Sequence, residues 1–292
     1  MPDLNQYINR IKNGLKKRGI YRRTIIKPSF FLAKTIERAR IRKFHNIHNS
    51  SERCFIIGNG PSINEMDLTL LKNEFTFVTN WFLLHKQYRD IRPDYYCISD
   101  SRVFCNKDAV STLKNNINIT GSSPKKFFPL SSRKIINNME PLGGKTAWYL
   151  DYVLYPIWES REVSLEIHNK VYTGDTIIID FCLPIAYYMG FKEIYLIGCD
   201  CSLGDQGSEN KDQKHFYKES GHKSKQQSNR YLKEEWLKNV LISYETIKII
   251  FESNGRKIYN AGYGGKLEVF DRVDYDSFFY RLSTKDKTVQ FK

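Results

Sequence analysis

Apolar and polar positions follow two different periods from residue 53 onward, which indicates strands and helices that alternate along the chain. Short runs of β-branched and aromatic residues predict strands at 53–58, 75–79, 95–99, 163–168, 193–198 and 256–260. Stretches with helical spacing predict helices at 64–72, 80–88, 106–116, 145–158, 175–189 and 231–253. This order is typical of an α/β protein with a Rossmann-like, doubly wound and mostly parallel sheet.

The first 50 residues follow a different pattern. Apolar residues recur at helical spacing, and Gly19 and Pro28 divide the stretch into short helices. We therefore expect a helical arm at 1–50 and one Rossmann-like domain at 51–292 that contains a lid loop at 203–230. A chain of 292 residues is long enough to bury a sizeable core in such a domain.

Positive charge is concentrated in the arm. Residues 1–45 hold thirteen Lys and Arg against two acidic residues, a net charge of +11 out of the chain's +14. An anionic inner-membrane surface attracts such a segment by about 1 kcal/mol for each basic residue near it. Packing of the arm on the domain is an alternative, and so is RNA binding. Because the body has no basic stacking platform, we expect no nucleic-acid partner.

Six cysteines lie mostly in apolar segments, and none forms a C-x-x-C pair or has a histidine at zinc-ligand spacing. This usage predicts reduced core thiols in a cytoplasmic protein. No run approaches the ~20 apolar residues of a membrane span, and the N-terminus lacks the apolar core of a signal peptide. We expect a cytoplasmic protein that is peripheral at the inner face of the membrane, and self-association is left open.

Polar residues gather where the expected strands end, and ligands of doubly wound sheets bind beyond these carboxyl ends. The candidate binding residues are Gly58, Asn59, Gly60, Ser62, Asn80, Ser99, Asp100, Thr173, Gly174, Gly198, Asp200 and Ser202.

The turn "GNGPS" at 58–62 has the composition of a phosphate-binding turn. Its glycines allow a close backbone approach, and Ser62 is expected to cap a following helix whose N-terminus attracts an anion. The amide of Asn59 suits a ribose, a base or a sugar. The alternative is a tight turn that binds nothing.

The loop at 203–230 is polar and long, and it contains His215, Tyr217 and His222. Beside the functional edge of the sheet, a neutral imidazole suits a general base for a sugar hydroxyl. Inert surface histidines are the alternative. The acidic residues of the loop have no recognised ligand spacing, so no metal site is expected.

The segment at 258–275 ends the domain with three glycines around Tyr263. Lys266 and Arg272 are candidates to face an anionic group of the substrate. Asp274-x-Asp276 matches a metal-diphosphate motif, but it follows no apolar strand and is expected to begin a C-terminal helix instead.

Several segments, in this order, resemble the sialyltransferases of glycosyltransferase family 42 and the wider MptE-like proteins (domain of unknown function 115), which often accompany lipopolysaccharide and capsule synthesis. They are "IIGNGPS", "FVTN" ending at Asn80, "GFKEIYLIGCD", "GHKS" and "NA-x-x-GGKLEVF-x-RVDY". The resemblance covers about residues 53–275.

This resemblance implies a metal-independent, Rossmann-like variant of the GT-A fold and a CMP-sialic acid donor. The implied contacts are Asn59, Gly60 and Ser62 with the nucleotide or its phosphate, Asn80 with the sugar or cytidine, Thr173 and Gly174 with the donor, and Gly198 and Asp200 with the cytidine ribose. The family's base is a histidine in a Tyr…Gly-His segment. Tyr217 and Gly221-His222 match it, so His222 is the first candidate base and His215 the second.

Two departures from the family pattern bear on the donor. Ser202 stands two residues past Asp200, where the family has a tyrosine that supports the leaving phosphate. The segment from Thr173 to Gly190 is longer than in the family, and Pro184 within it predicts a kink.

From these patterns we predict a metal-independent inverting glycosyltransferase. It would move a sugar, CMP-activated and sialic-acid-like or another keto-sugar acid, onto a bacterial cell-surface glycan or glycolipid, with histidine as general base. The alternatives are an MptE-like 6-hydroxymethylpterin diphosphokinase that uses ATP and Mg²⁺, and a non-catalytic subunit that binds a nucleotide sugar.

Overall fold

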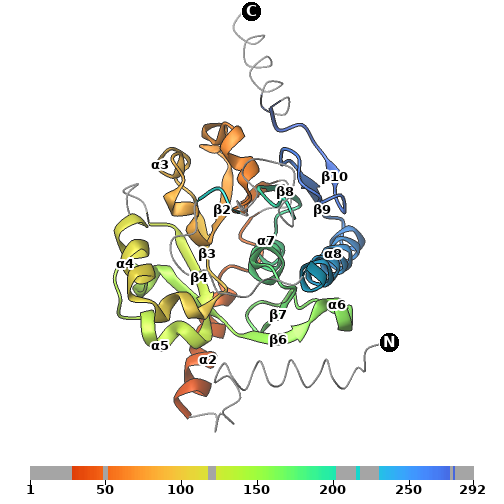
Figure 1. The fold of residues 1–292 in the computed structure, drawn as a ribbon. Helices are drawn as coiled ribbons and strands as arrows, with labels where there is room; N and C mark the ends of the chain where they lie inside the picture. The colour runs from red at the N-terminus through yellow and green to blue at the C-terminus, as the bar shows by residue number, and fades with distance from the viewer. Residues whose placement is uncertain are drawn as a thin grey trace, which may run out of the picture.

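Eight strands form one sheet in which every neighbouring pair runs parallel (Figure 1). Their spatial order is β10 (Asp271–Arg272), β9 (Lys257–Asn260), β8 (Glu193–Ile197), β1 (Arg53–Ile57), β2 (Phe75–Thr79), β3 (Tyr95–Cys97), β4 (Lys125–Pro129) and β5 (Ala147–Leu150). A separate two-stranded parallel sheet consists of β6 (Tyr152–Pro156) and β7 (Val171–Thr173). The computed structural model describes residues 28–48, 52–117, 123–201, 215–217, 230–276 and 279.

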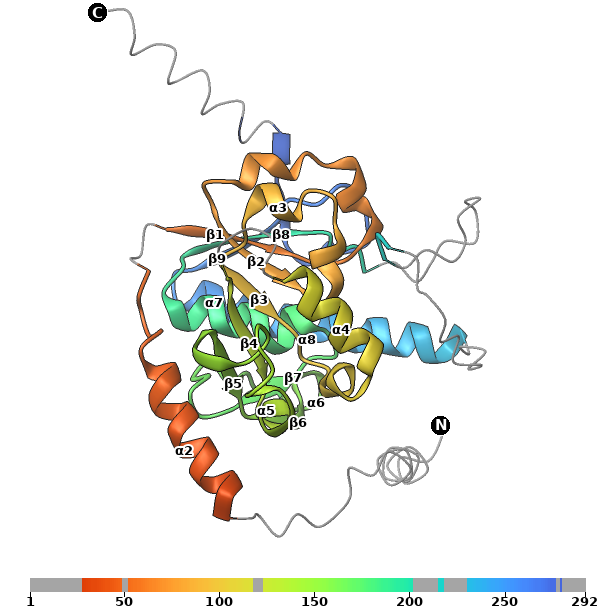
Figure 2. The same ribbon diagram turned by 90° about the vertical axis from the view of Figure 1, so that its left-hand side faces the viewer.

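Helices cover both faces of the large sheet (Figures 1 and 2). One face carries α3 (Tyr88–Ile91) and α4 (Lys107–Asn116), and the other carries α7 (Leu183–Met189) and α8 (Arg230–Ser253). Successive residues of β1 therefore enter different cores: Cys54 packs with α7 and α8, and Phe55 packs on the side of α3 and α4. The doubly wound α/β class predicted from the sequence is confirmed.

The helix predicted over 145–158 is wrong, because these residues form β5, β6 and the start of the short helix α6 (Ile157–Ser160). All four residues of β5 are buried. A short buried apolar run has no period that distinguishes a strand from a helix. The strand predicted at 163–168 is also wrong, since residues 161–166 have no regular structure.

The helices predicted at 64–72 and 80–88 are mostly 3₁₀ turns, at Pro61–Glu65, Leu68–Leu71 and Asn80–Leu84. A 3₁₀ turn places residues three apart on one side, and Leu68 and Leu71 are both buried. Only α3 follows them as an α-helix before β3.

The helix predicted over 175–189 is divided into a π-helical turn, Ile178–Cys182, and α7. Pro184 has no N–H to donate, and Leu183 donates to the Ile178 carbonyl five residues earlier. The helix ends at Gly190, whose φ of 102° confirms the predicted C-terminal glycine.

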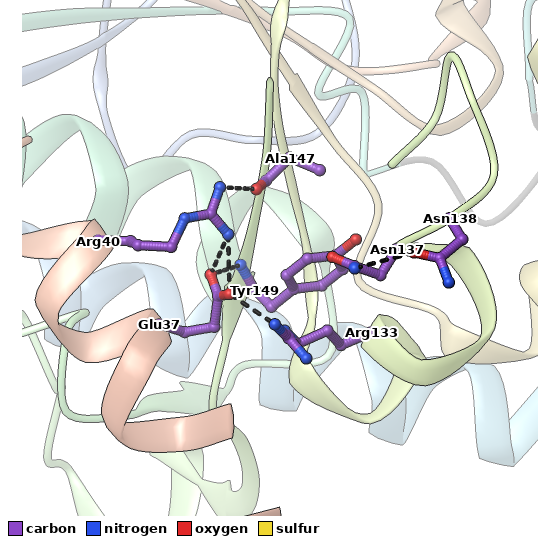
Figure 3. A network of polar contacts seen from close by, with 7 residues as sticks. All are labelled: Glu37, Arg40, Arg133, Asn137, Asn138, Ala147 and Tyr149. Carbon is purple, nitrogen blue, oxygen red and sulfur yellow. Dashed lines mark hydrogen bonds and ion pairs between the residues drawn. The ribbon is translucent and has the colours of Figure 1, made fainter. Parts of the chain in front are cut away.

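The N-terminal helix α2 (Pro28–Arg42) packs beside the edge strand β5 (Figures 2 and 3). Glu37 is only 1% exposed; it binds the guanidinium groups of Arg40 and Arg133 and accepts from the Tyr149 amide at 3.4 Å. Arg40 donates to the Ala147 carbonyl at 2.8 Å. These side chains therefore form hydrogen bonds with backbone groups of β5, which is an edge strand of the sheet in the described part of the chain.

This packing concerns only part of the arm predicted at 1–50, because residues 1–27 lie outside the described residues. The opposite side of α2 leaves Phe31 and Leu32 exposed by 67% and 61%. Among the described residues, no helix is both long and apolar enough to cross a membrane.

The short helix α5 (Arg133–Ile136) also packs near β5, since Ile136 belongs to the same hydrophobic core as Tyr149.

Candidate functional site

Strands β1 and β8 lie side by side at the point where the chain changes direction across the sheet. From β1 the chain continues to β2 on one side, and from β8 it continues to β9 on the other. Such a switch point opens a crevice at the carboxyl ends of the strands, where α/β proteins bind ligands. The turns that begin at Gly58 and Gly198 meet there, and we call this place the switch-point site.

Close packing of these two turns explains their glycines. The Gly60 amide donates to the Gly198 carbonyl at 2.8 Å, and a Cβ on Gly58 would collide with that same carbonyl oxygen. Gly198 has a φ of 63°, which favours glycine. The glycines are thus required for contact between the two turns, a reason that the sequence pattern did not show.

Ser62 and Asp200 join the two turns through side chains. The Ser62 amide and hydroxyl donate to the Asp200 carboxylate at 3.1 and 2.5 Å. Burial raises the pKa of Asp200, and the bonds from Ser62 oppose that shift. The expected cap is wrong: the 3₁₀ turn after Gly60 has no side-chain cap, and five residues are too short for an α-helical anion site.

In the side-chain amide of Asn59 the nitrogen is hydrogen-bonded, whereas the oxygen has no hydrogen-bond partner among the described residues. Its Nδ2 donates to the carbonyl and hydroxyl oxygens of Thr79, at 3.1 and 2.9 Å. Because Nδ2 faces a carbonyl, the amide orientation is defined, and Oδ1 is a buried acceptor that finds no partner in the part of the chain that the structure describes. The residue is 8% exposed. A buried acceptor of this kind suits a ligand that brings an N–H or O–H donor.

The neighbouring strand ends carry two further predicted residues. Asn80 follows β2 with a φ of 47°, and its carbonyl accepts from the Tyr96 hydroxyl. Asp100, beyond β3, binds the Arg102 guanidinium and caps the next turn. Ser99 is half-buried beside it.

A short described segment, 215–217, reaches the site from the predicted lid loop. The Phe216 amide donates to the Asn59 carbonyl at 3.0 Å, and its ring packs edge-on against Phe82 and His85. The rings of His215 and Tyr217 stack at 5.1 Å. The structure thereby brings His215 next to the switch-point site, whereas His222 and Ser202 lie outside the described residues.

Sequence reasoning missed Phe216 as the anchor of this segment and also missed His85. His85 is buried, its Nδ1 accepts from the Gln87 amide, and its Nε2 has no partner among the residues that the structure describes. Burial lowers its pKa to about 4, so the ring is neutral at physiological pH. The signal in the sequence was weak, since His85 follows an ordinary apolar run.

The C-terminal loop closes over Asp200. The Lys266 amide donates to the Asp200 carbonyl at 2.7 Å, and a Cβ on Gly265 would lie 2.7 Å from that oxygen. Arg272 binds Glu268 and donates to the carbonyls of Gly262 and Gly265 at 3.3 and 3.4 Å. Arg272 therefore braces the loop, and its contact with a substrate anion stays a prediction.

The turn Thr173–Gly174 lies at the end of β7, outside the large sheet. One hydrophobic core lies next to both this turn and the switch-point site, since it contains Ile179 after this turn and Tyr244 of α8, and Cys199 and Cys201 on either side of Asp200 pack against it. All six cysteines are free, as predicted.

This turn depends on Asp180, a residue that the sequence reasoning did not select. Asp180 is 4% exposed and accepts from the Gly174 amide at 2.5 Å. A single acidic residue within the apolar run "IIIDFC" was the available signal. Among the described residues, no three His, Cys, Asp or Glu side chains are grouped as a metal site.

Fold and site together define a doubly wound α/β protein with polar turns at the carboxyl ends of β1 and β8, the switch point of its sheet. The family model described as 6-hydroxymethylpterin diphosphokinase MptE-like matches residues 31–206, and the chain belongs to this family. The predicted resemblance to the MptE-like proteins is thus confirmed.

Sialyltransferase structures are among the solved structures similar to this chain. One is the sialyltransferase CstII from Campylobacter jejuni in complex with a substrate analogue, cytidine-5'-monophosphate, at 16% identity and a TM-score of 0.45, covering 77% of this chain and 86% of that one. Another is the sialyltransferase CST-II with a trisaccharide acceptor and CMP, at 16% identity and a TM-score of 0.41, covering 76% and 86%. No curated protein matches the chain.

Proposed function

We propose that the protein is a glycosyltransferase that binds a nucleotide-activated sugar, CMP-linked and sialic-acid-like, at the switch-point site. The observation that carries this proposal is the Oδ1 atom of Asn59, a buried acceptor at the carboxyl end of β1 that has no partner among the described residues. An exocyclic amino group or a ribose hydroxyl of a nucleotide would supply the missing donor. The expected cytidine and ribose contacts of Asn80 and Asp200 lie on the adjoining turns.

In the proposed reaction the acceptor hydroxyl attacks the sugar carbon, and the nucleotide phosphate leaves. A histidine takes the hydroxyl proton, which is worth roughly 10²–10⁴-fold in rate. His222 is the first candidate and His215, next to Asn59 through Phe216, is the second. Backbone amides and hydroxyls of the crevice would stabilise the leaving phosphate electrostatically.

A pterin diphosphokinase is the second candidate, and the description of the matched family favours it. Transfer of diphosphate from ATP needs Mg²⁺ held by carboxylates. The carboxylates at this edge are already engaged, since Asp200 binds Ser62 and Asp100 binds Arg102. These bonds favour the transferase over the kinase.

Thermal shift of the purified protein against CMP, UDP, GDP and ATP, each with Mg²⁺ or with EDTA, distinguishes the candidates. A ligand that binds only the folded state raises the melting temperature by mass action. The transferase predicts a shift with CMP that survives EDTA, and the kinase predicts a shift with ATP that depends on Mg²⁺. Binding without turnover of CMP-sialic acid would indicate a nucleotide-binding subunit instead.

Asn59→Ala tests the carrying observation directly. We expect loss of the CMP-induced shift, while Asn138→Ala, at an exposed asparagine just after α5 and near the edge strand β5, retains it. An unchanged shift in Asn59→Ala would refute the assignment of the site.

We also propose that the N-terminal region brings the enzyme to the inner face of the membrane, where a glycan or glycolipid acceptor is presented. The exposed Phe31 and Leu32 of α2 and the net charge of residues 1–45 support this proposal. Because α2 is held by Glu37, the suitable truncation removes residues 1–27 only. We expect the truncated protein to lose binding to anionic vesicles, and full retention would refute this role.

A further inference from the structure

Three side chains form a buried chain of hydrogen bonds that ends at the Thr173–Gly174 turn. The Tyr152 hydroxyl lies 2.9 Å from Oδ2 of Asp180 and 2.9 Å from the hydroxyl of Thr173. The other carboxyl oxygen, Oδ1, accepts from the Gly174 amide. We call these residues the Asp180 chain. It connects the π-helical turn with β6 and the end of β7.

The hydrogen bonds of the Asp180 chain can be arranged in two ways, which differ in the protonation state of Asp180. Tyr152 has one hydroxyl proton and two oxygen neighbours, so it donates to one and accepts from the other. When Asp180 is ionised it must accept, and Thr173 then donates its proton to Tyr152. When Asp180 is neutral it donates to Tyr152, Tyr152 donates to Thr173, and the Thr173 proton is free to point elsewhere.

Physiological pH lies close to the change between these states. Burial raises the pKa of Asp180 to about 8, opposed by the Gly174 amide and the Tyr152 hydroxyl and reinforced by Asp175. Among the described residues, the ionisable groups that act on Asp180 are thus Tyr152 and Asp175.

We propose that Asp180 is a positioning residue that sets, through Tyr152, whether the Thr173 hydroxyl donates a hydrogen bond to an anionic group of the nucleotide ligand. The inference rests on the proposed function in one respect, namely that a nucleotide binds beside this turn. Neutral Asp180 favours the anion, because it leaves Thr173 a proton to donate. Ionised Asp180 disfavours it, because Thr173 then presents only lone pairs.

Asp180→Asn tests the Asp180 chain with a side chain of nearly the same shape. The asparagine amide accepts from the Gly174 N–H and donates to the Tyr152 hydroxyl, as the neutral carboxylic acid does. CMP affinity is measured by calorimetry from pH 6 to 9.5. In the natural protein we expect it to fall by about tenfold with rising pH, the effect of one hydrogen bond to a charged group. In Asp180→Asn it stays high throughout. Asp175→Asn, at an exposed position with a φ of 66°, is the matched control: affinity still falls with rising pH, but the midpoint moves to lower pH because the charge of Asp175 no longer raises the pKa of Asp180.

Thr173→Val removes the proposed donor and is expected to bind CMP weakly at every pH. Equal pH dependence in the natural protein and in Asp180→Asn would overturn the inference.

Infrared spectroscopy of the ligand-free protein decides the inference without a nucleotide. At pH 6 we expect a protonated carboxyl band that is absent in Asp180→Asn. As this band disappears with rising pH, the C–O stretch of Tyr152, assigned with Tyr152→Phe, shifts with the same midpoint. Absence of the carboxyl band or an unmoved Tyr152 band overturns the inference. Failure of every variant to bind CMP would instead refute the proposed function.

Discussion

Replacing Gly60 with alanine places a methyl group against the Asp200 carboxyl group at the switch-point site. A Cβ on Gly60 would lie 2.7 Å from Oδ1 of Asp200 and closer still to its other carboxyl atoms. The backbone at Gly60, φ −62° and ψ 150°, is ordinary for alanine, so no strain arises from the conformation itself. Steric contact is therefore the expected source of any cost.

The size of the effect follows from two opposed terms. Gly→Ala at a compatible conformation stabilises a protein by about 0.4–1 kcal/mol through the unfolded state. Overpacking costs about 1–3 kcal/mol, and displacing the carboxylate weakens its two bonds to Ser62. We expect Gly60→Ala to lower the free energy of unfolding by about 1–2 kcal/mol.

A double-mutant cycle with Asp200→Ala isolates this contact. Asp200→Ala removes the three atoms nearest to the new methyl group, which are Cγ, Oδ2 and Oδ1 of Asp200. In that background Gly60→Ala is expected to stabilise the protein by about 0.4–1 kcal/mol, so the sign of its effect reverses. The four proteins are compared by urea unfolding, followed by tryptophan fluorescence, and the coupling energy should be about 2 kcal/mol.

Gly255→Ala is the matched control, because a Cβ there has nothing within 4 Å although φ is 67°. Its cost arises from the backbone alone and should be the same in both backgrounds. Additive effects of Gly60→Ala and Asp200→Ala, within about 0.5 kcal/mol, would refute the reasoning.

Three further predictions concern the rest of the molecule. Glu37→Ala should cost about 3–5 kcal/mol in urea unfolding, because it removes the buried carboxylate that binds the guanidinium groups of Arg40 and Arg133 and accepts from the Tyr149 amide. The exposed Glu252→Ala should cost under about 0.5 kcal/mol, and similar losses for the two variants would contradict this prediction. Because the pKa of His85 is lowered to about 4 in the folded state, the unfolded state binds a proton between about pH 6.5 and 4 that the folded state does not, and the free energy of unfolding falls over that range. His85→Phe should remove about 2 kcal/mol of this pH-dependent loss. Equal pH dependence of the free energy of unfolding in the natural protein and in His85→Phe would contradict this prediction. Only the exposed Cys105 should react rapidly with a thiol reagent in the folded protein, and rapid labelling that survives Cys105→Ser would show otherwise.

Local patterns were reliable where one residue type has one physical consequence. The buried strands β1, β2 and β8 are short runs rich in β-branched and aromatic residues, and the end of α7 follows from a glycine whose φ other residues rarely adopt. Patterns failed over 145–158, where an apolar run without a distinctive period forms the two strands β5 and β6.

By itself, the sequence determined the alternation of strands and helices, and with it the parallel sheet and the set of polar strand ends. It also determined where close turns occur, because glycine is required there. Only the tertiary structure decided that β8 pairs with β1, which brings Asp200 to Ser62 across 138 positions of the chain. It alone decided that Oδ1 of Asn59 is buried without a partner among the described residues, and that Tyr152 bridges Asp180 and Thr173 by hydrogen bonds. The physical reason is that hydrogen-bond satisfaction and burial depend on which distant segments meet, and no local period records those meetings.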